Sequence, residues 1–555
     1  MNTRKKWLFF SAVALLAAIF IVNSGSLNGY FVKDDFTIIA GCYDKGPAYL
    51  LSLFFKSWLP EFFPGMREYY ENRGTGMIRP IMIVAFKLDY WLYGISPFGY
   101  HIFNIVFHFL NAFLLLIIVE FITSEIWLGL IAGMLFALHP AQSSGVAYIS
   151  GRAEVIAATC YLLVFYLFLR YRATGAKTPY ILSLIIFFIG MFSKETSATL
   201  PFLIICYDML PELFTKPIGI RPLLEKAVKK SLSWSGYLGI LGVYFIIRKI
   251  ALGVFLGGYE GYFQLDLSAK LVNVLGYARL ALLASPWDFT FHNLSKPTPV
   301  ILSEILIAIF LLCFFAIPLP FTGIKNLVQA RLFSFSILWL IFSSVPAALA
   351  STQLSYIFPL YLYLVIVAIA CLMTSLLYSI YGKKFGTVLA AVLVIVYGGF
   401  QYKYNLDWNQ SGEFSRQVVI GVDKVAQDCH KGDTLILIGV PELCNTAWAF
   451  TGNLRDPFRK PFMNSEYITD FYIKAFSDVE AKSVIGRYAD GKPVAWDSVK
   501  RLLEDTPMPR PWMMGVMQDK PMNLNGNVSH AIRVLKWNEQ QNILEEAVEL
   551  GTVMP

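Results

Sequence analysis

Charged residues are scarce in this sequence. They make up 15% of the 555 residues, whereas 56% are hydrophobic and the mean hydropathy is +0.55. An ordinary soluble domain carries charge at about a quarter of its positions. Apolar runs of about 20 residues, long enough to cross a bilayer, recur from the N-terminus to residue 401. The shortage of charge therefore excludes an ordinary soluble protein and predicts an α-helical protein that crosses a membrane many times.

Several signatures of common chemistries are also missing. The sequence has no phosphate-binding glycine-rich loop, no zinc-type spacing of cysteine and histidine, and no Gly-x-Ser-x-Gly elbow. Of its seven cysteines, Cys429 and Cys444 lie in the polar C-terminal tail, where a disulfide forms only if the tail faces an oxidising compartment. The net charge of +8 comes from loop-sized groups of basic residues. This pattern is typical of cytoplasmic loops rather than of nucleic-acid binding.

We predict about eleven membrane-spanning helices. The first follows Arg4-Lys5-Lys6 and is interpreted as a retained span, because its apolar run is long and bulky for a cleaved signal peptide. The predicted spans are 7–23, 99–121, 126–139, 154–170, 180–193, 196–210, 234–249, 299–317, 332–349, 356–379 and 386–401. With the N-terminus in the cytoplasm, nearly every cytoplasmic loop carries basic residues and the C-terminal tail lies outside.

The chain is predicted to contain two domains. Residues 1–401 form a transmembrane catalytic domain with long outer loops at 24–98 and 250–298, and residues 402–555 form a small soluble extracytoplasmic α/β domain. In the outer loops, 81–93 is predicted to be an amphipathic helix at the membrane surface, and 271–284 an interfacial or re-entrant segment. In the tail, the sequence predicts a buried strand at 434–440 and two helices, at 497–505 and 541–550.

An acidic pair, Asp34-Asp35, follows the first predicted span at the outer membrane surface. Two adjacent carboxylates repel each other, so their position beside an apolar boundary needs a reason. One interpretation is a general base whose neighbour orients it or holds a cation. The other is a pair of solvated loop aspartates. The residues alone leave both open.

Two further charged groups lie at the outer ends of predicted spans. Arg152 and Glu154 open the fourth span, and Lys194 and Glu195 lie in the turn after the fifth. Charge at the edge of an apolar helix is costly and is usually functional or paired. Arginine suits a phosphate because its donors form a fork. The alternatives are that Arg152 and Glu154 pair with each other or snorkel to the lipid headgroups, and that Lys194 pairs with Glu195. All three charged groups map to the same predicted face.

The order of these segments resembles the GT-C glycosyltransferases, in particular the branch of protein O-mannosyltransferase-like and tetratricopeptide-bearing transmembrane mannosyltransferases. The matching segments are Phe31-Val-Lys-Asp-Asp, Ile78-Arg-Pro, Pro97-Phe-Gly-Tyr-His-Ile-Phe-Asn, Leu138-His-Pro, Gly151-Arg-Ala-Glu, Ser193-Lys-Glu-Thr, Tyr277-Ala-Arg-Leu through Ser285-Pro-Trp, and Tyr404-Asn-Leu-Asp-Trp. They cover residues 1–410. The repeats of the larger relatives are absent, and the segment Thr352–Pro359 lacks the family's arginine.

The resemblance implies a transferase that moves a mannose-like hexose, with inversion, from a polyprenyl-phosphate donor to a hydroxyl of a protein, lipid or glycan on the outer side of the membrane. That membrane is a bacterial inner membrane or an ER-like membrane. Asp34 or Asp35 is then the base, and Arg152 and Lys194 contact the donor phosphate. Supporting roles fall to Arg79, His139, Glu154 and Glu195. Mg²⁺ or Mn²⁺ could bind Asp34 and Asp35, and metal dependence stays open. The alternative function is a transporter or flippase of a lipid-linked substrate.

Overall fold

The computed structural model describes most of the membrane part of the chain and separate pieces of its tail. The described residues are 3–62, 76–214, 220–255, 281, 327–350, 359–427, 434–438, 443–444, 447–450, 456–463, 472–476, 532–538, 541 and 543–550.

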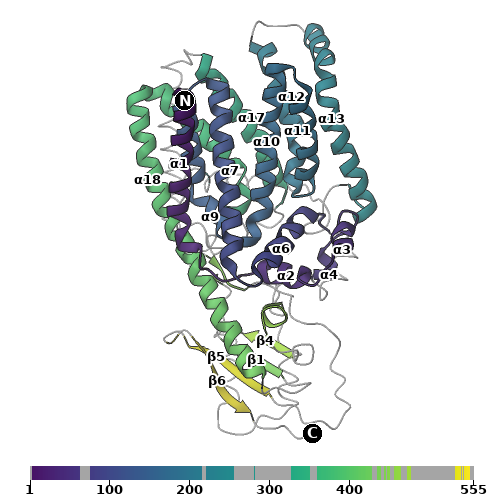
Figure 1. Cartoon of the computed structure of the whole chain (residues 1–555), viewed down its shortest axis with the longest axis vertical. Coiled ribbons are helices and arrows are strands. Elements are labelled where there is room, and N and C mark those ends of the chain that lie inside the picture. Colours follow the sequence, from purple (N-terminus) through teal and green to yellow (C-terminus); the bar gives the residue numbers. More distant parts are fainter. Residues whose placement is uncertain are drawn as a thin grey trace, which may run out of the picture.

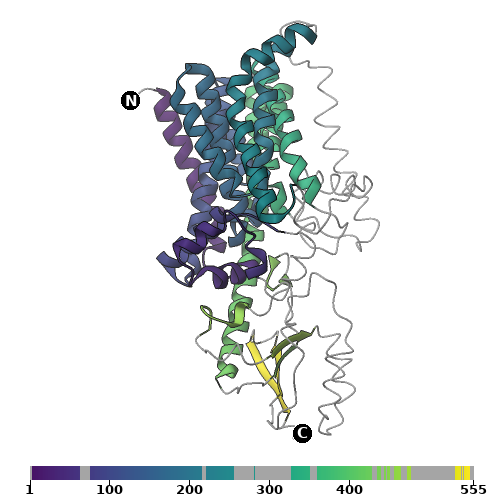
Figure 2. The same ribbon diagram turned by 90° about the vertical axis from the view of Figure 1, so that its right-hand side faces the viewer.

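Long apolar helices lie side by side in a bundle (Figures 1 and 2). They are α1 (Thr3–Asn23), α7 (Pro97–Thr123), α8 (Ile126–Ala137), α10 (Arg152–Thr174), α11 (Lys177–Met191), α12 (Leu200–Phe214), α13 (Ile220–Leu252), α17 (Leu327–Ala350) and α18 (Val365–Ala426). Every predicted span coincides largely with a helix except 299–317, which lies outside the described residues, as does 271–284. This is the architecture of an integral membrane protein.

Fewer of these helices could cross a membrane alone than the sequence predicts. Within the described residues, five are long and apolar enough to span it. A sixth span is formed if Ile126–Ala137 and Pro140–Val146, which meet at a 56° bend, count as one. The bend begins at His139-Pro140, where proline interrupts the helical hydrogen bonding. The number of spans therefore stays a prediction.

The long helix α18 contains two antiparallel limbs. Gly382 has φ 70° and breaks the helix, a conformation that glycine adopts without steric cost. The phenol of Tyr397 in the second limb then lies 3.9 Å from the sulfur of Met373 in the first. The second limb continues to Ala426, well beyond the predicted end of the span at residue 401. The predicted boundary between the two domains thus falls inside a continuous helix.

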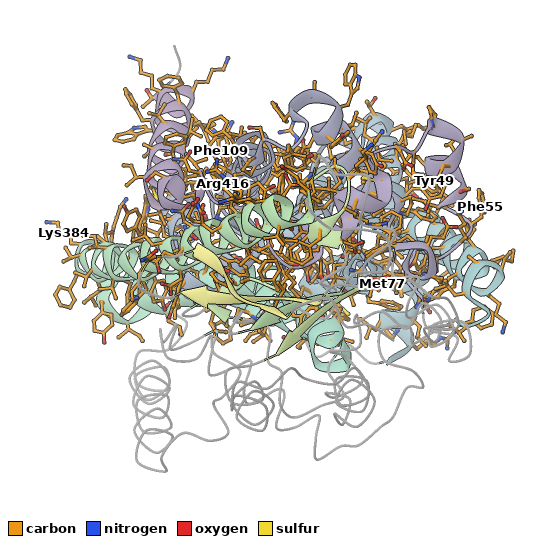
Figure 3. The ribbon with its side chains drawn as sticks, turned by 90° about the horizontal axis from the view of Figure 1, so that it is seen from below. Tyr49, Phe55, Met77, Phe109, Lys384 and Arg416 are labelled. Atoms are coloured by element: carbon orange, nitrogen blue, oxygen red, sulfur yellow. The ribbon has the colours of Figure 1, made fainter. Side chains whose placement is uncertain are left out.

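Short helices of the first outer loop cover one end of the bundle. They are α2 (Asp34–Cys42), α3 (Pro47–Ser52), α4 (Leu59–Phe62) and α6 (Pro80–Tyr93). The predicted helix at 81–93 is present as α6, which buries Ile83 and Phe86 and exposes Trp91. Viewed from that end, Tyr49 and Phe55 lie on the opposite side of the molecule from Lys384 at the α18 turn (Figure 3).

The described part of the tail contains a small sheet with the strand order β4-β1-β5-β6. β1 (Thr434–Ile438) pairs in parallel with β4 (Tyr472–Phe476) and β5 (Ile532–Asn538), and β5 pairs antiparallel with β6 (Ile543–Leu550). The strand predicted at 434–440 is confirmed. The helix predicted at 541–550 is wrong, because residues Ile543–Leu550 form the strand β6, whose backbone pairs with β5. The helix predicted at 497–505 lies outside the described residues.

Besides the core inside the helical bundle, a second hydrophobic core connects the tail to the first outer loop. It contains Phe36 of α2, Phe414 of α18, and Phe450 and Phe462 of the tail. The ring of Phe36 lies 4.9 Å from that of Phe462 and 6.0 Å from that of Phe450. Burial of these rings removes several hundred Å² of apolar surface from water, about 150–250 Å² for each ring. This core fixes the start of α2, where the acidic pair lies.

Candidate functional site

The acidic pair forms the first turn of α2. Asp34 is partly exposed, whereas Asp35 is fully buried. Negative charge is favourable here because the helix N-terminus carries partial positive charge. Lys33, which precedes the helix, has φ 48°, a conformation that costs about 1–3 kcal/mol for a residue with a side chain. Its N–H donates to the carbonyl of Ala449 at 2.9 Å, so the tail helps to hold this turn.

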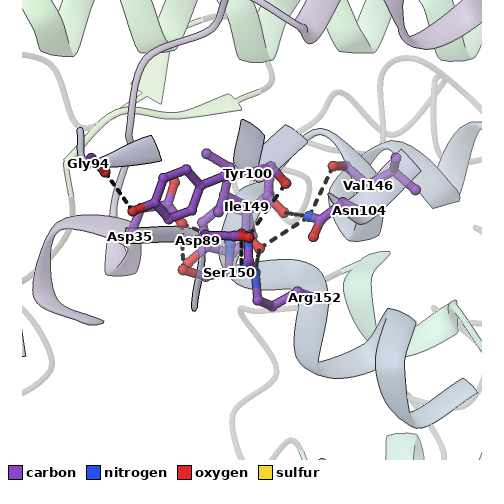
Figure 4. A network of polar contacts seen from close by, with 10 residues as sticks. Asp35, Asp89, Gly94, Tyr100, Asn104, Val146, Ile149, Ser150 and Arg152 are labelled. Atoms are coloured by element: carbon purple, nitrogen blue, oxygen red, sulfur yellow. Dashed lines mark hydrogen bonds and ion pairs between the residues drawn. The ribbon is translucent and has the colours of Figure 1, made fainter. Parts of the chain in front are cut away.

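Asp35 is held by neutral donors on every side that the structure describes. The N–H of Val32 donates at 3.1 Å to one carboxylate oxygen, and the N–H of Ser150 donates at 2.8 Å to the other, which also accepts the Ser150 hydroxyl (Figure 4). Burial raises the pKa of Asp35 to about 7 against the lowering effect of these hydrogen bonds, and the charge of Asp34 raises it further. Asp35 therefore has a fixed orientation and little capacity for a further ligand.

Asp34 has a single side-chain donor among the contacts that the structure describes. The Tyr148 hydroxyl donates to its Oδ2 at 2.8 Å. Burial raises the pKa of Tyr148 well above its usual value, and the two aspartates add to this, so the phenol stays protonated and donates. The Tyr148 ring stacks on Trp408 of α18 with centroids 5.2 Å apart. Asp34 is thus an oriented carboxylate that a substrate can reach.

Arg152 is enclosed in the protein. Its Nη1 lies 2.7 Å from a carboxylate oxygen of Asp89 on α6, and the guanidinium lies 4.1 Å from the centre of the Phe86 ring. The alternative in which Arg152 pairs with Glu154 is not found, because Asp89 is the partner. Arg152 also donates from Nε to the Ile149 carbonyl at 3.4 Å. The side chain is fully buried and its guanidinium is engaged by Asp89, and the contact with a donor phosphate stays a prediction.

A cation cluster gathers around Glu154, two residues further along α10, and Glu195, which follows α11. Lys194 pairs with Glu154, and Arg79 pairs with Glu195 at 2.8 Å. Arg248 of α13 also lies 3.9 Å from Glu195. The alternative in which Lys194 pairs with Glu195 is not found, because Glu195 turns toward the arginines. Burial raises the pKa of Glu195, but Arg79 and Arg248 outweigh it and hold this pKa at about 2.

Among the described residues, this cluster contains three cations, Arg79, Lys194 and Arg248, and two carboxylates, Glu154 and Glu195. The Lys194 ammonium also lies 4.9 Å from the centre of the Tyr361 ring. Arginine and lysine side chains gathered in this way are suited to bind an anionic group.

His139 belongs to neither group of charges. One ring nitrogen accepts the N–H of Ala141 at 3.2 Å, and the other lies 3.0 Å from the Ala281 carbonyl. The ring packs edge-on against Tyr397. Its contacts stabilise the bend after α8, so in this structure His139 shapes the bundle.

The described residues do not fit a resident metal ion. No group of three or more histidine, cysteine, aspartate or glutamate side chains gathers among them. The acidic pair itself offers a cation only Asp34, since Asp35 already accepts three hydrogen bonds.

Four residues of the site carried no role in the sequence-based prediction. Tyr148 and Ser150 lie just before the segment Gly151-Arg-Ala-Glu, Asp89 lies in the predicted helix 81–93, and Arg248 lies at the end of the span 234–249. The signal for Asp89 and Arg248 was available, because a charge inside an apolar helix needs a partner. Their partners come from distant segments, which spacing does not reveal.

These features define an integral membrane protein of helical bundle type with an oriented carboxylate and a cation cluster at one end. No family model matches the chain. It is similar to protein O-mannosyl-transferase Tmtc1 of Drosophila melanogaster, with 30% identity over 183 residues, covering 33% of this chain and 21% of the relative. It is also similar to human protein O-mannosyl-transferase TMTC1, with 32% identity over 211 residues, covering 36% of this chain and 23% of the relative.

The predicted resemblance to transmembrane mannosyltransferases is thereby confirmed for about a third of the chain, and the match spans about a fifth of the length of these relatives. Among solved structures, the chain is similar to ArnT from Cupriavidus metallidurans bound to undecaprenyl phosphate. The TM-score is 0.42 with 12% identity, covering 91% of this chain and 96% of that chain.

Proposed function

We propose that this protein is an integral membrane glycosyltransferase that transfers a mannose-like hexose from a polyprenyl-phosphate donor to an acceptor hydroxyl, with inversion. The observation that carries this proposal is Asp34, a partly exposed carboxylate oriented by Tyr148 beside the buried Asp35. The names of the relatives support a mannosyl group and a protein acceptor. A long isoprenoid carrier also needs an apolar bundle in which to lie.

Asp34 acts as the general base. It accepts the proton of the acceptor hydroxyl as the oxygen attacks the anomeric carbon. The bond from that carbon to the phosphate oxygen breaks, and the electron pair leaves with the lipid phosphate. Asp35 does not contact the substrate; its three hydrogen bonds fix the first turn of α2 and so the direction of Asp34.

The cation cluster stabilises the phosphate as negative charge grows on it. Arg79, Lys194 and Arg248 supply this stabilisation, and Glu154 and Glu195 keep the three cations in place. Ser150, which binds Asp35, and Glu154, which binds Lys194, are four positions apart in the chain. A short segment of chain therefore connects the support of the base to the phosphate site.

Arg152 lies between these two parts and is proposed to order the turn that connects them. This assignment rests on its contacts with Asp89 and the Ile149 carbonyl. We further propose that this end of the bundle, and the tail beside it, face the extracytoplasmic side, as the basic loops of the opposite end indicate.

The test uses the full-length protein in lipid nanodiscs with radiolabelled dolichyl- or undecaprenyl-phosphate mannose and serine- and threonine-containing peptides. The Asp34→Asn variant should transfer sugar about 10²–10⁴-fold more slowly than the unmodified protein, the usual contribution of a general base. Asp44→Asn is the matched control, because Asp44 is an exposed aspartate just after α2 that pairs with Lys45. Transfer at the normal rate by both Asp34→Asn and Asp35→Asn contradicts the proposal. Movement of the labelled lipid across the bilayer without transfer supports a flippase instead.

A further inference from the structure

The turn between α9 (Ser143–Val146) and α10 supplies the side chains that hold the acidic pair. Tyr148 donates to Asp34, and Ser150 donates twice to Asp35. A shift in the path of this turn would change the geometry of all three hydrogen bonds. What fixes the backbone of residues 146–150 therefore fixes the geometry of both carboxylates.

Asn104, on α7, binds the backbone of this turn from inside the bundle. Its side-chain amide nitrogen lies 3.2 Å from the carbonyl oxygen of Val146, 3.3 Å from that of Tyr148 and 3.2 Å from that of Ile149 (Figure 4). The residue is fully buried. Buried carbonyls without a donor are costly, and the two hydrogens of one amide serve three of them here.

We propose that Asn104 is a positioning residue for the acidic pair, holding the 146–149 backbone where Tyr148 and Ser150 donate to Asp34 and Asp35. Its effect on sugar transfer rests on the proposed function, whereas its effect on the turn does not. Asn104 is separated from the carboxylates by the turn itself, so its expected influence is on the rate of the chemical step and not on substrate binding.

The same helix offers a matched control. Asn111 lies two turns further along α7, is also fully buried, and donates from its amide nitrogen to the Val155 carbonyl and the Tyr363 hydroxyl, each at 3.0 Å. It does not contact residues 146–150 through these bonds. Asn111→Leu therefore removes the same group from the same helix without releasing the turn.

The experiment compares the full-length Asn104→Leu and Asn111→Leu variants in nanodiscs by steady-state transfer from polyprenyl-phosphate mannose and by hydrogen–deuterium exchange. Asn104→Leu should lower kcat about 10–100-fold, as a 1 Å misplacement does, with KM for the donor within about twofold. Exchange of the amides of residues 146–151 should become faster. Asn111→Leu should change neither kcat nor exchange in that segment, even if its melting temperature falls. If Asn104→Leu does not fold, Asn104→Ser retains one donor and should show a smaller effect in the same direction.

Normal kcat and normal exchange in Asn104→Leu, or in Asn104→Ser where that variant replaces it, overturn the proposal, as does an equal loss of kcat in Asn111→Leu. The exchange measurement separates this proposal from the proposed function. If the unmodified protein transfers no sugar but Asn104→Leu alone releases residues 146–151, the assignment of the reaction fails and the positioning role of Asn104 stands.

Discussion

The acidic pair and the cation cluster contact opposite ends of the segment 150–154, and their carboxylates are stabilised in different ways. Asp35 is surrounded by neutral donors, Val32 and Ser150. In the cation cluster, by contrast, each carboxylate is paired with a lysine or an arginine. Neutral donors orient a carboxylate without cancelling its charge, whereas ion pairs cancel charge and fix position. The first arrangement suits a carboxylate that orients a neighbouring base, and the second suits a phosphate site.

The strongest test of this contrast is the pH dependence of stability. The pKa of Asp35 is about 7 in the folded protein against 3.8 as the ordinary value. Its contribution to stability is fully present below 3.8 and is lost as the pH rises through about 7, because the native state holds the proton longer than the unfolded state. The loss is on the order of 4 kcal/mol.

This contribution is measured as the difference between the unmodified protein and Asp35→Asn in detergent melts at pH 4 and at pH 7.5. The stability of the unmodified protein relative to Asp35→Asn should decrease as the pH is raised from 4 to 7.5. If the difference in stability between the two proteins is the same at pH 4 and at pH 7.5, the neutral donors stabilise the carboxylate as well as an ion pair does.

The buried pair between Arg152 and Asp89 gives the next largest effect. Asp89→Asn removes the negative charge and leaves a fully buried guanidinium without its counter-charge. The expected cost is about 3–5 kcal/mol of unfolding free energy. Asp44→Asn, which breaks an exposed pair, should cost less than about 1 kcal/mol. Similar melting temperatures for the two variants would show that Arg152 is solvated.

Within the cation cluster, Arg79→Met should slow transfer by about 100-fold, the effect of removing one donor to a developing negative charge. Arg4→Met is the matched control, since Arg4 binds Glu120 through two short hydrogen bonds at the opposite end of the bundle. Single-turnover rates with bound donor provide the comparison. Equal rates in Arg79→Met and Arg4→Met would assign the cluster a purely structural role.

The hydrogen bond from Tyr148 to Asp34 gives the smallest effect. Tyr148→Phe keeps the ring that stacks on Trp408 and removes one donor. Transfer should slow by about tenfold, corresponding to about 1.4 kcal/mol, a usual value for a hydrogen bond to a charged group. Trp408→Phe tests the stacking separately, and its rate of sugar transfer should be closer to that of the unmodified protein. An effect of Tyr148→Phe as large as that of Asp34→Asn would make the phenol itself a catalytic group.

The sequence predicted the positions of helices better than the contacts between them. Apolar runs give spans because the bilayer length is fixed, so α7 and α10 lie where expected. The sequence also identified the acidic pair as a candidate site. It did not predict the partners of the charged side chains. Arg152 and Asp89, for example, are 63 positions apart and meet only after α6 folds onto α10. The sequence pattern predicted a helix at 541–550, but pairing with β5 makes this segment a strand.

A cryo-EM structure of the full-length protein with undecaprenyl phosphate tests the central claim most directly. The account predicts that the phosphate lies within hydrogen-bonding distance of at least two of Arg79, Lys194 and Arg248, with Asp34 facing the space beside it. A phosphate bound at the other end of the bundle, near Arg4 and Glu120, would contradict it.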